Sequence, residues 1–470
     1  MAKMTHRTLP DLPSFTGSAF FPGDAGYAEE VSGFQAAYTH RPALVIAAAD
    51  AEDVRTAVAY AARQGMPVAV QATGHGLSVA AEGGILISTR RMTTVRIDAE
   101  RRTAHVAAGV RAGALIEAAA AHGLAPLTGS SPSVGVIGYT LGGGVGLLAR
   151  QFGYAADHVR AVEMVTADGR LRRVEPGDAL FGAVLGSGGN LGVVTALEVE
   201  LVPVRTVYGG RLVFDTPLVE KALETWLRWA AEAPEELTSS VTLLGYPDIP
   251  QVPSLLRGRY VASVRIAYNG PADEGERLVA PLREAGERLE DDLRTMPYTE
   301  SGSIHSDPDD PHPYAATNAL LGELTPEAMR GLLATAGPDS PVPCVVDIRH
   351  LGGALHKEGP TRIAVDHREA EFLVRVISTH GPVGSGPDEV RDRHALVRER
   401  LAPWTLGHSL NFLYGYGEYA DEAQTRAGYR AATYDRLAAL KAVHDPQNLF
   451  RFNRNIRPAT GSVDPAGDLP

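Results

Sequence analysis

The chain has 470 residues, a net charge of -12 at pH 7, and hydrophobic and charged fractions of 44% and 21%. This composition indicates a globular protein of two or three domains. The acidic charge argues against a nucleic-acid surface, which needs a basic patch to bind phosphates. The single cysteine, Cys344, excludes internal disulfides and cysteine-based metal clusters. The sequence has neither an apolar run of about 20 residues that could span a bilayer nor the apolar core of a signal peptide, so we expect a cytoplasmic protein.

Strand and helix patterns alternate along the first 205 residues. The apolar run at 41–49 predicts a buried strand. The segment 50–64 predicts a helix, because acidic residues open it and Gly65 ends it. The same reasoning predicts strands at 66–73, 84–89, 103–110, 159–166 and 193–202 and a helix at 111–122.

Glycine is concentrated where these strands and helices meet, at 74–76, 129–146 and 186–192. Glycine costs backbone entropy on folding, so such clusters indicate loops in which the backbone approaches a ligand closely. The last cluster has the pattern G-x-G-x-x-x-G, which is one residue too long for a Rossmann fingerprint, and it precedes a strand instead of opening a helix. Two interpretations remain: tight turns that pack helices on a sheet, or loops whose N–H groups line a diphosphate.

From residue 206 onward the pattern changes to strands separated by amphipathic helices. Strands are predicted at 240–245, 261–269 and 345–350, and helices at 217–232, 273–288, 325–336, 387–401 and 422–442. This order predicts a sheet covered by helices on one side. The segment 301–313 is polar and rich in proline; its histidines and aspartates could bind a cation, but a solvated loop is the more common outcome.

His75 stands between two glycines directly after a predicted strand. Its imidazole could serve a metal, a proton, a phosphate or a covalent bond. No H-x-x-x-H or H-E-x-x-H pattern accompanies it, so we expect no metal site. Phosphate is better assigned to the glycine N–H groups around it. The residues alone leave proton transfer and a covalent bond open.

Four blocks of the sequence agree with one family. They are the G-H-G at 74–76, G-S-S-P-S-V-G-V-I-G-Y-T-L-G-G-G-V-G at 129–146, S-G-G-N-L-G-V-V-T at 187–195, and D-P-Q-N-L-F-R-F-N-R-N-I at 445–456. As a set, they resemble the berberine-bridge-enzyme-like flavoproteins. That family belongs to the vanillyl-alcohol-oxidase group with the PCMH-type FAD-binding fold.

The resemblance covers nearly the whole chain and implies an α+β protein with FAD as its cofactor. An FAD-binding domain would comprise residues 1–205, with its PCMH-type part of two small α/β subdomains at about 38–205. A substrate-binding domain, an antiparallel sheet backed by helices, would be inserted at 206–415. Residues 416–470 would return to the FAD-binding domain.

In this family, a histidine in an R-S-G-G-H block forms a bond to the 8α-methyl group of the flavin, and His75 matches it. Gln71 and Thr73 replace the arginine and one glycine of that block. Many members have a second bond from a cysteine, whose place is taken here by Ser131. Serine cannot form the thioether, and Cys344 lies far away in the chain. The resemblance therefore implies FAD held covalently by His75 alone.

The resemblance also places the other cofactor contacts. With His75, the residues expected to bind FAD are Gln71, Ala72, Thr73, Gly74, Gly76, Leu77, Ser78, Gly129, Ser130, Ser131, Val134, Gly135, Gly138, Tyr139, Leu141, Gly142, Gly143, Gly144, Gly146, Leu147, Gly189, Asn190, Gly192, Val193, Val194, Asn411, Asn453 and Asn455. Val134 matches a gate position beside the flavin. Valine there goes with oxygen reactivity and a larger aliphatic residue with blocked access, so an oxidase is favoured over a dehydrogenase.

The catalytic base is not assigned by the sequence. Family members often have Y-x-N before the C-terminal block, where this chain has Ser409 and Asn411 at the tyrosine and asparagine positions. Tyr414 and Tyr416 follow closely and could supply a phenol. Its pKa of about 10 would need a lowering neighbour before it could act as a base.

A second candidate pair lies in the segment 345–354, which resembles the family's R-H-L-G-G-A. Alternation along a strand puts Val346, Ile348 and His350 on one face and Asp347 and Arg349 on the other. If the apolar face packs on helices, Asp347 and Arg349 point toward the flavin and are candidate catalytic residues. An ordinary ion pair on a strand is the alternative.

The resulting hypothesis is an FAD-dependent oxidase that removes a hydride from a CH–OH or C–N bond of a small organic molecule, for example a secondary metabolite or glycoside, with O₂ as acceptor and H₂O₂ as product. A flavin-dependent dehydrogenase or oxidative cyclase is the nearest alternative. A flavin-binding protein without turnover is a third, favoured only by the missing tyrosine.

Overall fold

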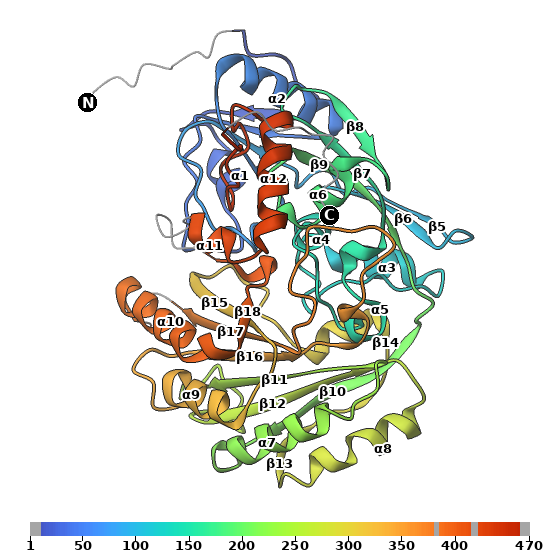
Figure 1. The fold of residues 1–470 in the computed structure, drawn as a ribbon, viewed down its shortest axis with the longest axis vertical. Coiled ribbons are helices and arrows are strands. Elements are labelled where there is room, and N and C mark those ends of the chain that lie inside the picture. Colours follow the sequence, from blue (N-terminus) through green and yellow to red (C-terminus); the bar gives the residue numbers. More distant parts are fainter. Residues whose placement is uncertain (1–10, 380–384, 415–421, 461–470) are drawn as a thin grey trace.

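The computed structural model describes residues 11–379, 385–414 and 422–460. Two small sheets lie at one end of the molecule and a large sheet at the other, and the C-terminal helices run back beside the small sheets (Figure 1). The amino- and carboxyl-terminal parts of the chain therefore share one body, and the middle of the chain forms the other.

The first small sheet has four strands, in the order β1 (Ser18–Phe20), β2 (Leu44–Ala47), β4 (Ile85–Ser88) and β3 (Val68–Gln71). Strands β2, β4 and β3 are parallel and largely buried, which is typical of parallel sheets covered on both faces. Helix α1 (Tyr27–Val31) precedes them, and α2 (Ala51–Gln64) connects β2 to β3. As the sequence predicts, α2 begins at an acidic cap, Asp50, and ends at Gly65 in the left-handed conformation.

The second small sheet is antiparallel throughout. Its order is β5 (Val95–Asp98), β6 (Thr103–Ala107), β9 (Val193–Glu200), β7 (Val159–Val165) and β8 (Leu171–Val174). The helices between these strands are α3 (Ala112–Ala120), α4 (Val136–Leu141), α5 (Ala149–Phe152) and α6 (Ala179–Ser187). Apolar side chains from both small sheets and from α2 form one continuous core.

The large sheet is antiparallel and has nine strands. They are β10 (Thr206–Phe214), β11 (Leu237–Gly245), β12 (Tyr260–Tyr268), β13 (Arg288–Asp291), β14 (Arg294–Pro297), β15 (Tyr314–Leu321), β16 (Val345–His350), β17 (Phe372–Thr379) and β18 (Thr405–Gly407). Their order is β13-β10-β12-β11-β16-β17-β15-β18, and β14 pairs with β10. Six of these strands, including the long strands β15 and β17, were not predicted.

Helices cover one face of the large sheet, and the small sheets lie beyond the other (Figure 1). The covering helices are α7 (Val219–Ala230), α8 (Ala272–Arg283), α9 (Pro326–Ala336) and α10 (Pro387–Leu401). Val346 and Ile348 of β16 share a core with Trp226 of α7 and Met329 of α9. The alternate residues of each central strand therefore face the small sheets.

The C-terminal segment departs from the expected single helix at 422–442. The structure has α11 (Glu422–Arg426) and α12 (Ala431–His444) instead. The break occurs because the backbone N–H of Arg430 donates to the Asp366 carboxylate at 2.7 Å and not to the preceding turn. Helix α12 can then pack near α6, in the body that contains the two small sheets.

Candidate functional site

The loop after β3 carries His75 and closely approaches the loop that contains Gly33. Gly74 has a φ of +73°, and a Cβ atom there would lie 2.7 Å from the Gly33 Cα, so this position requires glycine. Gly76 is exposed, with no atom within 4 Å of where its Cβ would be. Among the described residues, no acceptor is bonded to the backbone N–H groups of residues 73–76. Contact with the Gly33 segment fixes the loop, while the backbone N–H groups of residues 73–76 are available to bind a ligand.

The His75 ring lies against the Phe34 ring, with centroids 3.9 Å apart and an angle of 13° between the planes. Its Nδ1 is 2.8 Å from the Thr73 hydroxyl oxygen, and its Nε2 is 3.3 Å from the Ser133 hydroxyl oxygen. Burial, with a contribution from Arg111, lowers the pKa of His75 to about 4. The imidazole is therefore neutral near pH 7 and keeps a lone pair, which a nucleophile needs.

Ser131, which takes the place of the family's cysteine, lies close to the His75 ring. Ser131 Oγ is 2.8 Å from Ser133 Oγ, so two hydroxyls lead from Ser131 to the His75 ring. Val134 follows on this loop and is half-buried. Cys344, in contrast, is buried next to β16 of the large sheet. The structure thus brings His75, Ser131 and Val134 together and leaves the cysteine elsewhere.

Asn411 connects the chain after β18 to the second glycine loop. Its side-chain Nδ2 donates to the Tyr139 carbonyl at 2.9 Å, and its Oδ1 accepts from the Gly144 N–H at 3.0 Å. A Cβ on Gly142 would lie 2.6 Å from the Asn411 amide, so the loop can close only with glycine there. The Tyr139 hydroxyl is buried without a hydrogen-bond partner in the described part of the chain.

The third glycine loop is joined to the C-terminal block. Asn190 donates through Nδ2 to the Arg454 carbonyl at 2.9 Å, and Asn453 donates to the Gly189 carbonyl at 3.4 Å. The side-chain oxygens of Asn453 and Asn455 are buried and have no hydrogen-bond partner among the residues described. Segments that are far apart in the chain therefore form one wall of the site.

These loops fit a dinucleotide such as FAD. Their backbone is open at Gly76, Gly138, Gly188 and Gly189, where no atom lies within 4 Å of an added Cβ. Free N–H groups and open backbone are what a diphosphate binds, because partial positive charge on N–H groups attracts phosphate oxygens. A neutral imidazole at the end of the first loop completes the set.

The remaining residues expected at the cofactor support these loops. Gln71 is buried, where its amide donates to the Ser32 carbonyl at 2.9 Å. Leu141, Val193 and Val194 are buried in the core. The walls of the loops contain Ala72, Leu77, Ser78, Gly129, Ser130, Gly135, Gly143, Gly146, Leu147 and Gly192, all buried or half-buried.

Tyr414 reaches the same region, whereas Tyr416 lies outside the described residues. The Tyr414 ring is 5.6 Å from the ring of Tyr314, whose hydroxyl donates to the His75 carbonyl at 2.8 Å. Burial raises the pKa of Tyr414, although Arg375 and Tyr314 pull it down. The lowering that a base would need is not found, and a protonated phenol acts as a hydrogen-bond donor.

Asp347 and Arg349 lie on the face of β16 that looks toward the small sheets. Asp347 Oδ2 is 2.9 Å from Arg349 Nε, and its oxygens lie 3.9 Å from Arg265 and Arg375. Arg349 Nη1 donates to the Val145 carbonyl of the second glycine loop at 3.5 Å. Burial alone would raise the pKa of Asp347, but the guanidiniums hold it far below its usual range. Asp347 is therefore an ionised partner of arginines and a poor base.

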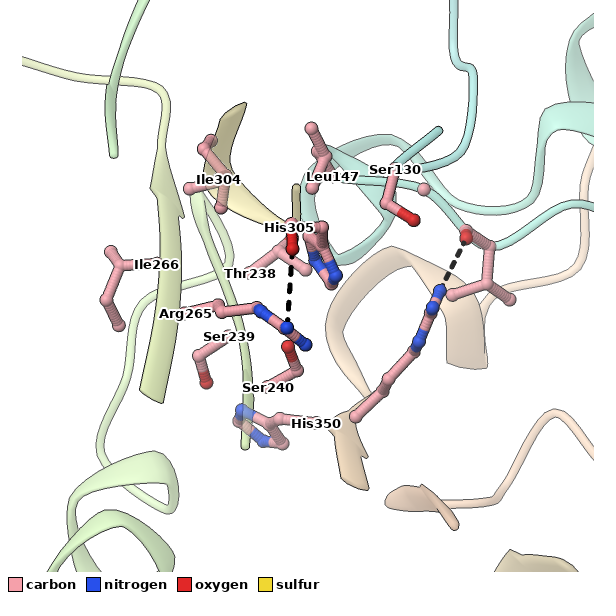
Figure 2. A pocket seen from close by; sticks show the side chains of 14 residues that line it. Ser130, Leu147, Thr238, Ser239, Ser240, Arg265, Ile266, Ile304, His305 and His350 are labelled. Carbon is pink, nitrogen blue, oxygen red and sulfur yellow. Dashed lines mark hydrogen bonds between the residues drawn. The ribbon is translucent and has the colours of Figure 1, made fainter. Parts of the chain in front are cut away.

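A small cavity, with a volume of about 20 Å³ open to the centre of a water molecule, lies between this face of the sheet and the second glycine loop (Figure 2). Of its polar residues, Arg349 and Ser130 were expected at the site from the sequence, whereas Arg265 was not. Arg265 of β12 points into it and donates to the His305 carbonyl at 3.3 Å. A signal was present, because Arg265 and Arg375 are each the single charged residue in an otherwise apolar or neutral strand.

No helix within residues 11–379, 385–414 and 422–460 is long and apolar enough to cross a membrane. Over the same ranges, no three His, Cys, Asp or Glu side chains gather as metal ligands. In the polar loop 301–313, Asp307 accepts instead from the Ser130 hydroxyl at 2.5 Å. This hydrogen bond joins the loop to the segment that contains Gly129 and Ser131.

Two sequence families match parts of the chain. The FAD binding domain family matches residues 42–175, and the family described as berberine and berberine like matches residues 416–457. The two matches cover the glycine loops around His75 and Tyr139 and the block that contains Asn453 and Asn455. They contain most of the loop residues from which the site is built.

Similar proteins extend over almost the whole chain. The (R)-6-hydroxynicotine oxidase of Paenarthrobacter nicotinovorans is 29% identical over 467 residues, which are 95% of this chain and 97% of that protein. The uncharacterised FAD-linked oxidoreductase YvdP of Bacillus subtilis is 26% identical over 94% and 98% of the two chains. The crystal structure of 6-hydroxy-D-nicotine oxidase from Arthrobacter nicotinovorans superposes with a TM-score of 0.80 at 27% identity, covering 95% and 99%.

Proposed function

The chain belongs to the berberine-bridge-enzyme-like FAD-linked oxidoreductases with the PCMH-type FAD-binding fold, and on that basis we propose that it is an oxidase whose FAD is bonded covalently to His75 alone. The observation that carries the proposal is the neutral His75 imidazole, held between the Thr73 and Ser133 hydroxyls at the open end of the glycine loops. A neutral imidazole nitrogen could form a C–N bond to the 8α carbon. One methyl C–H and the imidazole N–H would be broken, both hydrogens would leave as protons, and the two electrons would pass through the flavin to O₂.

The chemistry that FAD would supply when bound is acceptance of a hydride and transfer of two electrons to an acceptor. The chain binds and orients the reactants. The N–H groups of residues 73–76 and the open backbone at Gly188 and Gly189 would hold the diphosphate. Asn411 keeps the second loop closed against the sheet. The inner face of the large sheet would then position the substrate across from the ring system.

The neighbours of His75 support a single covalent bond. Ser131 has the position from which a cysteine would form the second bond, but a hydroxyl does not form a thioether. The Cys344 thiol lies 3.2 Å from the Val342 carbonyl at the large sheet and is engaged there. His75 is then the one covalent attachment we propose.

Oxygen as the acceptor is supported by Val134 and by the relatives. Val134 is half-buried next to the Ser131–His75 corner, and a small side chain at this place leaves room for O₂. The 29% identical relative is named an oxidase. The bond oxidised would be CH–OH or C–N in a small organic molecule, such as a secondary metabolite or glycoside.

Rapid mixing of the reduced enzyme with air-saturated buffer tests this proposal. We expect flavin absorbance to return within seconds and one H₂O₂ to appear per flavin. Val134→Leu should slow the return at least tenfold, because the longer side chain fills the approach, while Val136→Leu in the core of α4 serves as the matched control. Reoxidation that takes many minutes in the unchanged protein would instead support a dehydrogenase or oxidative cyclase.

One observation favours a flavin-binding protein without turnover. Ser409 stands where the family has tyrosine, and burial raises the pKa of Tyr414. Screening alcohols and amines for H₂O₂ release separates the two functions. Release with any substrate, above the rate of a control lacking substrate, excludes the non-catalytic function.

A further inference from the structure

We propose that the substrate carries an organic carboxylate, which binds the guanidiniums of Arg265 and Arg349 in the cavity against the large sheet. The inference rests on the proposed oxidase function and names the class of its substrate. The cavity is lined on one side by β11, β12 and β16 and on the other by the second glycine loop (Figure 2).

Two buried polar atoms on the cavity face of the sheet have no hydrogen-bond partner among the described residues. They are the Ser240 hydroxyl and Arg265 Nε. Buried polar groups without partners are rare in native proteins and cost about 1–3 kcal/mol each. Two beside one cavity indicate that a ligand supplies the missing partners.

Both atoms can donate a hydrogen bond. A guanidinium only donates, and a hydroxyl can rotate to do so. His350 takes no part, because its ring lies on the other face of β16, stacked on Phe372 with centroids 5.6 Å apart. Two neighbouring donors call for a ligand rich in acceptors.

The charge balance beside the cavity also indicates an anionic ligand. Arg265, Arg349 and Arg375 surround Asp347, and Asp307 is the second carboxylate near them. Three guanidiniums against two carboxylates leave one positive charge in excess in a buried place. Excess buried charge is costly unless a ligand compensates it.

Arg150 is a further buried guanidinium, whose donors go to the carbonyls of Leu237, Leu351 and Ala233 and to His350. The carboxylates of Glu371 and Glu235 lie near it and offset its charge. The excess positive charge at the cavity therefore comes from the three arginines on the sheet.

The apolar part of the cavity selects an organic anion over an inorganic one. Leu147 and Ile304 line it together with the polar residues (Figure 2). An apolar body with one carboxylate fits such a mixed lining. Placed there, the body lies between the sheet and the second glycine loop, where the oxidised carbon must be.

Titration of the flavin-loaded protein with sodium benzoate, benzamide and phenyl phosphate tests the inference, with binding followed by calorimetry and by the flavin absorbance band. We expect benzoate to bind at least tenfold more tightly than benzamide, which has the same ring without the charge. Equal affinity for benzoate and benzamide would overturn the inference. Tighter binding of phenyl phosphate than of benzoate would overturn the assignment of a carboxylate.

Variants locate the site. Arg265→Gln should weaken benzoate binding roughly 10- to 150-fold, which corresponds to about 1.5–3 kcal/mol for a hydrogen bond to a charged group. Ser240→Ala removes one donor with little risk to folding and should weaken it by up to about tenfold. Arg211→Gln is the matched control, because Arg211 lies opposite Arg265 on β10 and is paired with Glu290 at 2.7 Å.

Two further results separate this inference from its competitors. If the arginines instead served the flavin ring, Arg265→Gln would shift the flavin reduction potential and leave benzoate affinity unchanged, which would refute the carboxylate site. If benzoate binds as expected but no acid or alcohol releases H₂O₂, the oxidase proposal fails and the carboxylate site stands. If only neutral substrates are oxidised and benzoate does not bind, the carboxylate site fails and the oxidase proposal stands.

Discussion

Replacing Lys441 by methionine should loosen the attachment of the C-terminal block to the FAD-binding loops. Lys441 and Asp445 form an ion pair of 2.6 Å in which both side chains are completely buried. The Lys441 ammonium also donates to the carbonyls of Asn190 and Phe450 at 2.7 and 2.9 Å. One side chain thus joins α12, the third glycine loop and the segment that carries Asn453.

The size of the effect follows from burial. Lys441→Met removes the cation paired with a buried carboxylate and leaves two carbonyls without their donor. Breaking a buried pair in this way costs about 3–5 kcal/mol. The unfolding entropy of a chain of this length is roughly 1 kcal/mol/K, so the melting temperature should fall by about 3–5 °C. Lys357→Met is the matched control: its pair with Glu235 is exposed and is worth about 0–1 kcal/mol.

Thermal melting followed by flavin fluorescence measures both variants, because released or exposed flavin becomes brighter. We expect a clear downward shift for Lys441→Met and none above about 1 °C for Lys357→Met. Lys441→Met/Asp445→Asn should recover part of the loss, since no buried charge is then left unpaired. Equal shifts in the two single variants would refute the reasoning that burial sets the strength of this pair.

Three further predictions concern the FAD loops. Because the folded pKa of His75 is about 4 and the unfolded value is about 6.5, the stability from the neutral imidazole is complete above pH 6.5 and is lost as the pH falls toward 4. The melting temperature of the flavin-free protein should therefore fall more steeply over this range than that of His75→Ala; identical slopes would contradict the shifted pKa. Ser131→Cys in the His75→Ala background should restore flavin that stays attached in acid, because only the Ser133 hydroxyl lies between the Ser131 hydroxyl and the His75 ring. Flavin absorbance that is lost from the protein in acid would show that a cysteine at position 131 does not reach the flavin. Gly142→Ala should destabilise the flavin-free protein by about 1–3 kcal/mol, since its Cβ would lie 2.6 Å from Asn411, whereas Gly138→Ala in α4 has open space and should be neutral or stabilising by about 0.5–1 kcal/mol in urea titrations; the reverse order would be inconsistent with the packing.

Local patterns were enough to find the elements around the cofactor. The acidic start and glycine end of α2 are contained in the residues next to it, so its limits could be predicted to within a residue. Alternation in β16 likewise separated Asp347 from Val346 and Ile348, because strand geometry alone decides which face each side chain takes. The glycine loops were recognisable as sites of close backbone approach because their glycines are clustered in short local stretches of sequence.

What the sequence could not supply depends on partners far away in the chain. Gly74 is required by Gly33, which lies 41 residues earlier. The break between α11 and α12 depends on Asp366, which captures the Arg430 N–H and lies outside any local window. Strand β15, rich in alanine, is a strand because β17 and β18 flank it.

The arginine cluster illustrates the same limit at the site. Arg265, Arg349 and Arg375 belong to three strands, and only the antiparallel register brings them around Asp347. Each looks like an isolated charge in its own strand. Their shared cavity became visible only when the order of the strands was known.

The covalent bond to His75 is tested most directly by the intact mass of the acid-denatured chain. We predict that the unchanged protein carries the mass of one FAD after denaturation and that the yellow colour stays with the polypeptide, whereas His75→Ala has the mass of the bare chain and releases its flavin. A bare chain with free flavin from the unchanged protein, or an FAD adduct that survives in His75→Ala, would contradict the assignment of His75 as the covalent attachment.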